Sequence, residues 1–343
     1  MDKQQVLKKL ETIIYPELDK NIVELKLIDS LHVKEKSLHV KIDTDNKKAF
    51  SFIARAIPKL LKNDFRDIEV EKKLKETKKS LEYGSSKFPN NRAPYAKKVI
   101  AISSGKGGVG KSTVSANFSV ALAQKGYKVG LLDADVYGPS IPRLFGIENE
   151  KLQWNHKNKI IPHENFGVKI MSVGLTTPAK DTPLVWRSSV AISALIQFLE
   201  DVDWGELDFL VIDMPPGTGD VQLSMAEELP LFGAILVTTP QTLACDDVSR
   251  SVMMFRDIHV KILGLIENMS YFIAPDTNKR YDIFGKDGGK KICEKYALNL
   301  LGQIPLEMNI MQMSDKGKIP IALGDESVKE YYKKIVKKVL EED

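Results

Sequence analysis

The chain has 343 residues, of which 43% are apolar, and a formal net charge of +4. A chain of this length can hold two domains or one large domain, and its apolar content is enough for a substantial core. Because the charge is small and spread over acidic and basic residues, composition does not imply nucleic-acid binding.

The features that would place the chain outside the cytoplasm are absent from the sequence. The first residues lack the apolar stretch of a secretory signal, and no run approaches the length of a transmembrane helix. Two cysteines far apart in sequence fit a reducing compartment and give no disulfide framework. We therefore expect a cytoplasmic protein whose partners include neither a membrane nor nucleic acid.

Residues 1–74 are expected to form a separate small α+β domain. Apolar residues recur there at helical spacing in two places and alternate with polar residues between them. In chain order the expected elements are a helix over 6–14, an alternating segment over 23–27, a hairpin over 31–42 that turns near Glu35, a helix over 50–61 and a strand over 68–70. The element order is α-β-β-α-β.

A linker is expected over residues 75–96, where lysine-rich sequence runs into Gly, Ser, Pro and Asn without apolar periodicity. Residues 97–343 then alternate short apolar runs with helical patterns. The expected strands are 99–102, 129–132, 209–212, 234–237 and 262–266. This alternation predicts an α/β domain with a mostly parallel sheet covered by helices on both faces.

Residues 105–113 read Gly-Lys-Gly-Gly-Val-Gly-Lys-Ser-Thr and lie between an apolar β-branched run and a helical pattern. They fit both the phosphate-loop (P-loop) pattern G-x-x-x-x-G-K-[ST] and the dinucleotide fingerprint G-x-G-x-x-G. A dinucleotide loop needs no cation beyond its backbone N–H groups. Lys111, however, is placed to reach the β- and γ-phosphates of a triphosphate, and the Ser112 hydroxyl can ligate Mg²⁺.

The loop therefore favours ATP and a P-loop NTPase fold. Asp133 keeps the dinucleotide alternative open, because it ends the next strand where a ribose-binding acid would stand. The loop residues expected to bind the nucleotide are Gly105, Lys106, Gly107, Gly108, Val109, Gly110, Lys111, Ser112 and Thr113.

A second apolar strand ends in Asp213, which is the Walker B arrangement. Its carboxylate is expected beside the phosphate loop, where it holds Mg²⁺, commonly through water. The Pro-Pro-Gly-Thr-Gly turn at 215–219 is a candidate switch loop that repositions with the γ-phosphate. The alternative is a strand end followed by an ordinary turn.

Asp133 and Asp135 follow the strand at 129–132 and project to one side of it. At the carboxyl edge of a parallel sheet they would lie near the phosphates. One of them can support Mg²⁺ coordination while the other orients the attacking water. Alternatively, both carboxylates cap the next turn.

Together these residues resemble the Mrp/ApbC iron–sulfur cluster carriers, a branch of the deviant-Walker ATPases that also include the MinD/ParA proteins and the nitrogenase iron protein. The resemblance runs from about residue 97 to the C-terminus. The segments that carry it are Lys106, 133–140, 213–220, 267–270 and 302–306.

The resemblance implies a homodimer that encloses ATP, in which Lys106 of one subunit reaches the nucleotide of the other. It further implies that Lys106, Lys111 and Asp135 are catalytic, with Asp135 positioning the water. Asp213 with Ser112 would hold Mg²⁺, and Asn268 would contact the adenine. The partners implied are iron–sulfur apoproteins or assembly factors.

The element order of residues 1–74 and the Tyr-Pro-Glu-Leu-Asp segment at 15–19 resemble the small MIP18-type domain often placed before Mrp ATPases. Counterparts of that domain act in iron–sulfur assembly. The sequence itself shows no chemistry there, so a docking or stabilising module is an equal alternative.

The main departure from the family follows residue 269. Family members that hold a bridging cluster usually carry a Cys-Pro-x-Cys-like pair there, whereas this chain has Ala274 and Thr277 on either side of Pro275 and Asp276. Neither side chain replaces a thiolate as a soft ligand for iron. The ligands of an iron–sulfur cluster therefore stay unassigned.

Other residues do not offer an obvious cluster site. Cys293 falls in a helical pattern typical of a small packed hydrophobe, and Cys245 is followed by two aspartates that oppose thiolate formation. The histidines show no metal-ligand spacing; they are His32, His39, His156, His163 and His259.

Two further segments have alternative interpretations. Trp186 and Arg187 are either a dimer-interface anchor or ordinary surface packing. The helical pattern at 328–340 suggests either a closing helix on the sheet or a membrane-targeting helix, and its acidic end favours the closing helix.

The sequence thus predicts an ATP-hydrolysing carrier that binds and transfers iron–sulfur clusters. An ATP-switched assembly scaffold that holds no cluster, and a MinD/ParA-like positioning ATPase, are the alternatives.

Overall fold

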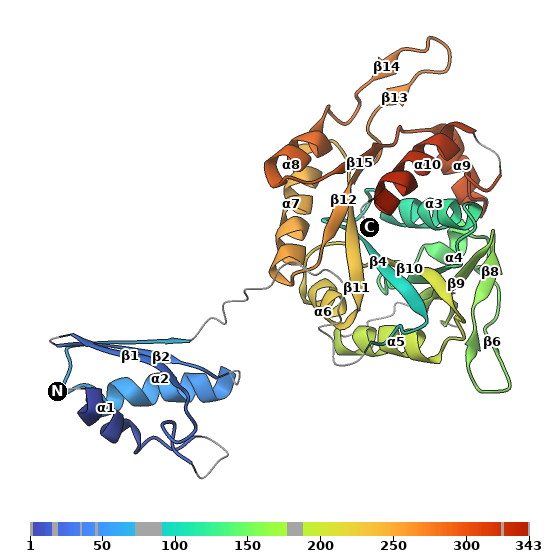
Figure 1. The fold of residues 1–343 in the computed structure, drawn as a ribbon. Helices are drawn as coiled ribbons and strands as arrows, with labels where there is room; N and C mark the ends of the chain where they lie inside the picture. The colour runs from blue at the N-terminus through green and yellow to red at the C-terminus, as the bar shows by residue number, and fades with distance from the viewer. Residues whose placement is uncertain are drawn as a thin grey trace. The chain divides into compact units, whose positions relative to one another are not determined.

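The computed structural model describes residues 3–15, 20–34, 36–44, 47–72, 91–176, 188–323 and 326–341. The chain divides into two compact units, one within residues 1–82 and the other within 83–343 (Figure 1). Several interpretations from the sequence lie outside the described residues and stay predictions; they concern residues 16–19, the turn at Glu35, most of the linker and the pair Trp186–Arg187.

The first unit is a three-stranded sheet, in the order β1-β2-β3, with two helices. Its elements are α1 (Lys3–Leu10), β1 (Ile28–Lys34), β2 (Ser37–Ile42), α2 (Lys47–Leu61) and β3 (Asp67–Lys72). β1 and β2 pair antiparallel, whereas β2 and β3 pair parallel, with α2 as the crossover between them. This is the α-β-β-α-β order expected from the sequence.

Alternation along β2 explains the core of this unit. Leu38, Val40 and Ile42 are buried with Ile53 and Ile57 of α2, so the even positions of β2 face the helices. The odd positions face the opposite, open side of the sheet.

The alternating segment at 23–27 is not extended in the structure. The amide of Leu25 donates to Asn21 O and that of Lys26 to Val23 O, and Lys26 has a φ of 53°. These hydrogen-bonded turns bring the chain from α1 into β1, which begins at Ile28.

The second unit is built on an eight-stranded sheet in the order β15-β12-β11-β4-β10-β5-β9-β8. Its strands are β4 (Ala96–Ser104), β5 (Val129–Asp133), β8 (His163–Asn165), β9 (Val168–Ser172), β10 (Leu207–Asp213), β11 (Leu231–Thr238), β12 (Ile262–Glu267) and β15 (Leu300–Gln303). Every pairing is parallel except that of β8 with β9. The five strands expected from the sequence all form.

Helices cover both faces of this sheet (Figure 1). One face carries α3 (Lys111–Gln124), α4 (Ile141–Leu144), α9 (Met308–Asp315) and α10 (Glu326–Glu341). The other carries α5 (Ser188–Asp201), α6 (Asp220–Glu228), α7 (Thr242–Asp257) and α8 (Gly288–Tyr296). Small elements complete the unit: β6 (Gln153–Trp154), β7 (Ile160–Ile161), the 3₁₀ turn η1 (Val173–Leu175), β13 (Phe272–Ile273) and β14 (Arg280–Tyr281).

The central strands read as continuous apolar runs because both of their faces are buried. In β4, Val99 and Ala101 belong to the core under α5 to α8, while Ile100 and Ile102 belong to the core under α3 and α10. The helix α10 buries Tyr332 in this second core, as expected for a closing helix. None of the helices among the described residues is long and apolar enough to cross a membrane.

Candidate functional site

The predicted site residues meet at the carboxyl edge of the large sheet. The loop after β4, the acids that end β5 and β10, and the Asn-Met segment after β12 all leave the sheet on this edge. Asp133 and Asp213 are register partners of the neighbouring strands β5 and β10. In the order of the sheet, β5 lies on one side of β4 and β11 lies on the other. The connection from β4 to β5 and the connection from β10 to β11 therefore run in opposite directions across the sheet. A ligand site is expected at such a switch of direction.

The phosphate loop has the backbone that its glycines predict. Gly108 and Gly110 have φ values of 82° and 80°, a region that residues with a side chain rarely adopt. At Gly105 a Cβ would lie 2.2 Å from the carbonyl carbon of Asp247 in α7, so only glycine fits there. A Cβ at Gly107 would meet nothing within 4 Å. The loop is thus packed on α7 at Gly105 and open around Gly107 and Gly108.

Lys111 begins α3 and lies buried among carboxylates. Its Nζ is 2.9 Å from Asp213 Oδ1 and 3.7 Å from Asp135 Oδ2. Asp213 also accepts hydrogen bonds from Ser112 Oγ at 2.6 Å and Ser115 Oγ at 2.7 Å. The phosphate-loop lysine, its neighbouring serine and the strand-end aspartate are therefore in direct contact, as the sequence predicted.

Asp133 and Asp135 differ in their surroundings. Asp133 is completely buried and accepts hydrogen bonds from the amides of Asp135 and Ile141 and from Ser172 Oγ. Burial, followed by the charge of Asp213, raises the pKa of Asp133 to about 7. Its carboxylate therefore shapes the loop between β5 and α4. The enclosure also removes the ribose contact that the dinucleotide alternative requires.

Asp135 is the acid of this pair that faces the phosphate-loop lysine. Its Oδ1 accepts from the amides of Tyr137 and Gly138 at 3.3 Å, and its other oxygen approaches Lys111. Burial raises the pKa of Asp135, and the Lys111 charge opposes that rise. Of the two acids, Asp135 is therefore the one with a carboxylate oxygen 3.7 Å from Lys111 Nζ.

The Asn-Met segment after β12 closes on the phosphate loop. Asn268 Nδ2 donates to Val109 O at 2.9 Å, and a Cβ at Gly110 would come within 2.2 Å of that same nitrogen. Asn268 was expected to contact the adenine, which stays a prediction; in the structure its side-chain amide fixes the phosphate loop.

Glu267 was not assigned a role from the sequence, although it ends β12 as Asp213 ends β10. It is fully buried and accepts hydrogen bonds from Gln303 Nε2, Ser270 Oγ and the Gly289 amide at the start of α8. An acid at the end of an apolar strand was the available signal. Two of its partners, Gly289 and Gln303, could not be foreseen because they come from distant segments of the chain.

Lys106 and the candidate switch loop lie on either side of the end of β4. Ser104 O accepts from the Gly217 amide at 2.8 Å, and Ser104 Oγ donates to Lys106 O at 2.9 Å. Gly217 has a φ of 100°. The Lys106 ammonium makes no ion pair with any residue in the part of the chain that the structure describes. Thr113 lies in the first turn of α3, where its carbonyl accepts from Asn117 Nδ2.

The donors around Lys111 suit Mg²⁺. The side chains of Ser112, Asp213 and Asp135 supply hydroxyl and carboxylate oxygens, the hard ligands that this ion prefers. Both Asp213 oxygens already accept hydrogen bonds, so this carboxylate is suited to contact through water. Ser112 Oγ would then be the direct ligand of a bound Mg²⁺ ion.

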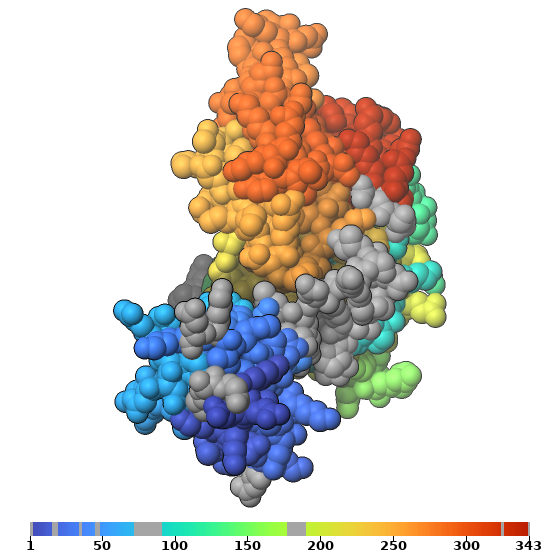
Figure 2. Space-filling view, turned by 60° about the vertical axis from the view of Figure 1, so that its left-hand side comes forward, coloured from blue at the N-terminus to red at the C-terminus, as the bar shows by residue number. Residues whose placement is uncertain are grey.

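Ala274 and Thr277 lie at the tip of a hairpin formed by β13 and β14. The amide of Ala274 donates to Lys279 O at 3.0 Å, and its carbonyl accepts from the Asn278 amide at 2.8 Å. In Figure 2 this orange segment stands out from the body of the second unit. A bridging pair of thiolates would thus occupy an exposed tip, and here alanine and threonine stand in those positions.

Both cysteines are buried, as expected for packed hydrophobes. Burial and the nearby Glu267 raise the pKa of the Cys245 thiol, and the same causes raise that of Cys293 to about 11. Cys245 Sγ lies 3.6 Å from Thr239 O. Neither thiol is poised to ligate iron in the folded chain.

The fold and the site define a P-loop nucleotide-binding protein of the ParA type. Residues 95–340 match the family described as ParA, NUBPL iron-transfer P-loop NTPase, and residues 3–71 match the iron-sulfur cluster assembly protein family. The chain therefore belongs to the NUBPL iron-transfer P-loop NTPases, preceded by an iron–sulfur cluster assembly domain.

Similar proteins carry related names. An iron-sulfur cluster carrier protein of Aquifex aeolicus is 49% identical over 73% of this chain and 69% of its own. One of Deinococcus radiodurans is 40% identical over 94% of this chain and 90% of its own. A nucleotide-binding protein of Archaeoglobus fulgidus, solved in complex with ADP, has 36% identity and a TM-score of 0.60, covering 68% of this chain and 92% of that one.

The buried thiols predict slow chemical labelling. At pH 8, about one thiol in a thousand is ionised when its pKa is about 11, and the thiolate is the reactive form. Cys245 and Cys293 should react with a thiol-specific disulfide reagent far more slowly in the native chain than in denaturant. The rate for Cys293 should rise as the pH approaches 11. A Thr277→Cys variant, with its thiol at the hairpin tip, is the exposed control. A native cysteine that labels as fast as this control would contradict the burial described.

Proposed function

We propose that this chain is an Mg²⁺-dependent ATPase that transfers iron–sulfur clusters to apoproteins. The observation that carries the proposal is the contact of Lys111 with Asp213 and Ser112 beside an open phosphate loop. Membership of an iron-transfer family supplies the class of cargo. The names of its relatives support the same assignment.

The phosphates of ATP bind the backbone N–H groups of the loop and the Lys111 ammonium. Lys111 Nζ lies 2.9 Å from Asp213 Oδ1, so phosphate oxygens compete with this carboxylate for the ammonium. Mg²⁺, when bound, neutralises charge on the phosphates. Ser112 and Asp213 are the residues that would hold it, Asp213 through water. Asn268 uses one N–H of its side-chain amide for the bond to Val109 O. Its side-chain oxygen and its second N–H contact the adenine.

Hydrolysis takes place in a homodimer. Asp135 positions the attacking water, since its carboxylate already lies beside Lys111. Lys106 acts on the nucleotide of the partner subunit. Two observations support this role of Lys106. The residue lies next to the open part of the loop, and its ammonium makes no ion pair within the described ranges. An ammonium placed there can stabilise charge on the transferring phosphoryl group.

The hairpin tip favours a second candidate. Ala274 and Thr277 leave the chain without the thiolate pair that a bridging cluster needs. An ATP-switched assembly scaffold, which binds apoproteins or assembly factors and holds no cluster itself, accounts for this observation. The two candidates share the nucleotide site and differ only in the cargo.

Lys111→Ala should weaken ATP binding by about 10–150-fold, since a charge-assisted contact is commonly worth ~1.5–3 kcal/mol. Lys125→Ala is the matched control, because Lys125 is an exposed lysine at the far end of the same helix. Calorimetry with ATP and Mg²⁺ measures both, and thermal melting confirms that each variant is folded. Equal ATP affinity in the Lys111→Ala variant and the parent would contradict the site. NAD binding as tight as that of ATP would revive the dinucleotide alternative.

Lys106→Ala should leave ATP binding nearly intact and suppress turnover. An arginine finger in the same role is worth ~10³–10⁵ in rate. Mixing Lys106→Ala with Asp135→Asn tests action across the interface, because a mixed dimer keeps one site with Asp135 from one subunit and Lys106 from the other. Phosphate release should rise well above that of either variant alone. No recovery at any mixing ratio would argue against the dimer mechanism.

The isolated chain should hold iron–sulfur clusters weakly or not at all, and Ala274→Cys with Thr277→Cys should raise its cluster content sharply. Thiolates hold iron far better than hydroxyl groups do, and two subunits would supply four of them. The double serine variant at the same positions is the control. Anaerobic reconstitution, iron counting and absorption spectroscopy provide the measurement. A stoichiometric cluster in the parent that survives Cys245→Ser and Cys293→Ser would contradict this prediction.

A further inference from the structure

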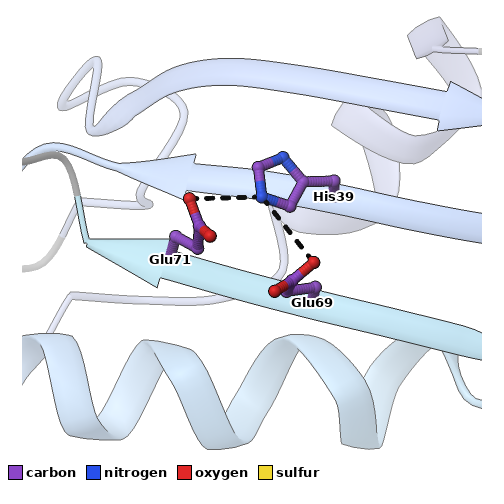
Figure 3. A group of neighbouring side chains, drawn as sticks. All are labelled: His39, Glu69 and Glu71. Atoms are coloured by element: carbon purple, nitrogen blue, oxygen red, sulfur yellow. Dashed lines mark ion pairs between the residues drawn. The ribbon is translucent and has the colours of Figure 1, made fainter.

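The open face of the small sheet in the first unit carries a polar cluster that the proposed function does not use. His39 lies on β2 at one of the odd positions, opposite to the buried Leu38 and Val40. Glu69 and Glu71 lie on β3 and point to the same side (Figure 3). The three side chains come from two adjacent strands of one sheet.

Strand register sets this arrangement. In the parallel pair of β2 with β3, His39 is the partner of Glu69, and Glu71 is the next residue of β3 on the same face. His39 Nε2 lies 3.3 Å from Glu71 Oε2 and 4.0 Å from Glu69 Oε2. One ligand atom from each residue lies within 4.8 Å of the others.

These separations are close to those of a metal site. Nitrogen and oxygen ligands lie about 2.0–2.2 Å from Zn²⁺, which places them roughly 3.0–3.5 Å from one another. The His39–Glu71 distance already falls in that range. Glu69 is the most exposed of the three, at 71% for its side chain, so rotation of its flexible chain can close the remaining gap.

The donor set selects the kind of cation. One imidazole with two carboxylates suits divalent first-row metals such as Fe²⁺, Co²⁺ and Zn²⁺. Mg²⁺ and Ca²⁺ prefer oxygen-only ligands, and an iron–sulfur cluster requires thiolates. Glu69 and Glu71 are exposed and His39 is half-buried, so further coordination positions are left to water.

We propose that His39, Glu69 and Glu71 form a binding site for one divalent first-row transition-metal ion on the open face of the first unit. The site holds a single aquated ion, reached from solvent. It goes beyond the proposed ATPase and cargo function and does not depend on it. The sequence could not show this site, because Glu69 and Glu71 follow His39 by 30 and 32 residues. They meet His39 only through the register of β2 with β3.

Two neighbouring residues define the limits of the site. Lys41 Nζ lies 3.9 Å from Glu71 Oε2, so its ammonium competes with a bound cation for that carboxylate. His32 is the register partner of His39 on β1, with ring centroids 6.5 Å apart. The His32 ring therefore lies beside His39 across the sheet, but it is not one of the three residues whose ligand atoms lie within 4.8 Å of one another.

The test is calorimetric titration of the full chain with Co²⁺ in excess Mg²⁺, so that oxygen-rich sites elsewhere are occupied. The His39→Gln and Glu71→Gln variants should each lose at least about tenfold in affinity at one site, since even indirect changes at metal sites cost about 10–100-fold. Lys41→Gln should bind Co²⁺ several-fold more tightly. Titration with Zn²⁺ should rank the variants in the same order.

Matched controls separate ligation from surface charge. Glu11→Gln removes the same charge as Glu71→Gln from an exposed position of the same unit, and His32→Gln removes the neighbouring imidazole. Both should bind Co²⁺ within about twofold of the parent. Circular dichroism and melting curves check that every variant is folded. In the parent, paramagnetic shifts of the His39 ring protons should appear with Co²⁺.

Two results would overturn the proposal. One is a parent chain whose Co²⁺ binding is unchanged by His39→Gln and Glu71→Gln. The other is a loss in the Glu11→Gln or His32→Gln control as large as that in the ligand variants.

Discussion

The ion pair between the Lys111 ammonium and the Asp213 carboxylate is the interaction on which the arrangement of the second unit's site depends. Its two side chains are 6% and 0% exposed, so both charges lie out of water. A buried charge without a partner is strongly destabilising, so each must be held in place. Lys111 is the cation common to Asp133, Asp135 and Asp213, and its charge acts on the pKa values of Asp133 and Asp135. Burial and the neighbouring Asp213 charge raise the pKa of the completely buried Asp133 to about 7, and the Lys111 charge only partly opposes that rise.

This pairing also connects the elements of the site. Asp213 ties β10 to α3 through Ser112 and Ser115, and Asn268 ties the phosphate loop to the segment that leads into β13. The amide of Ser270 donates to Ile304 O, and that of Leu306 to Tyr271 O, at the base of the hairpin. The chain runs directly from Asn268 into β13, so the residue that contacts the phosphate loop is six residues before Ala274 at the hairpin tip. In the proposed function, a change at the phosphate loop reaches the cargo end through this short segment.

Much of the second unit followed from its sequence, for a physical reason. Strands buried on both faces are continuous apolar runs, so the strand at 209–212 was found together with the acid that ends it. Three strands of the sheet were not predicted, namely β8, β9 and β15. β8 and β15 are short edge strands of three and four residues, whereas β9 is as long as the predicted β5. The alternation at 23–27 was misleading, since a period of two does not distinguish a strand from turns that bury every other residue. The motif residues were found because phosphate chemistry fixes their spacing.

Contacts between distant segments could not be predicted in the same way. The bonds of Glu267 to Gln303 and Gly289, and the packing of Asp247 against Gly105, depend on how helices and strands stack. The histidines were judged by sequence spacing, which is informative only for ligands on one element. His39 meets Glu69 and Glu71 through strand pairing, a relation that no local spacing records.

The most direct test of this account is a crystal structure of the chain with Mg²⁺ and a non-hydrolysable ATP analogue. The Lys111 ammonium should leave Asp213 for the β- and γ-phosphates. Ser112 and Asp213 should then face the Mg²⁺ ion, and Lys106 should contact the nucleotide of the partner subunit. An analogue bound elsewhere, with Lys111 still paired to Asp213, would contradict the account.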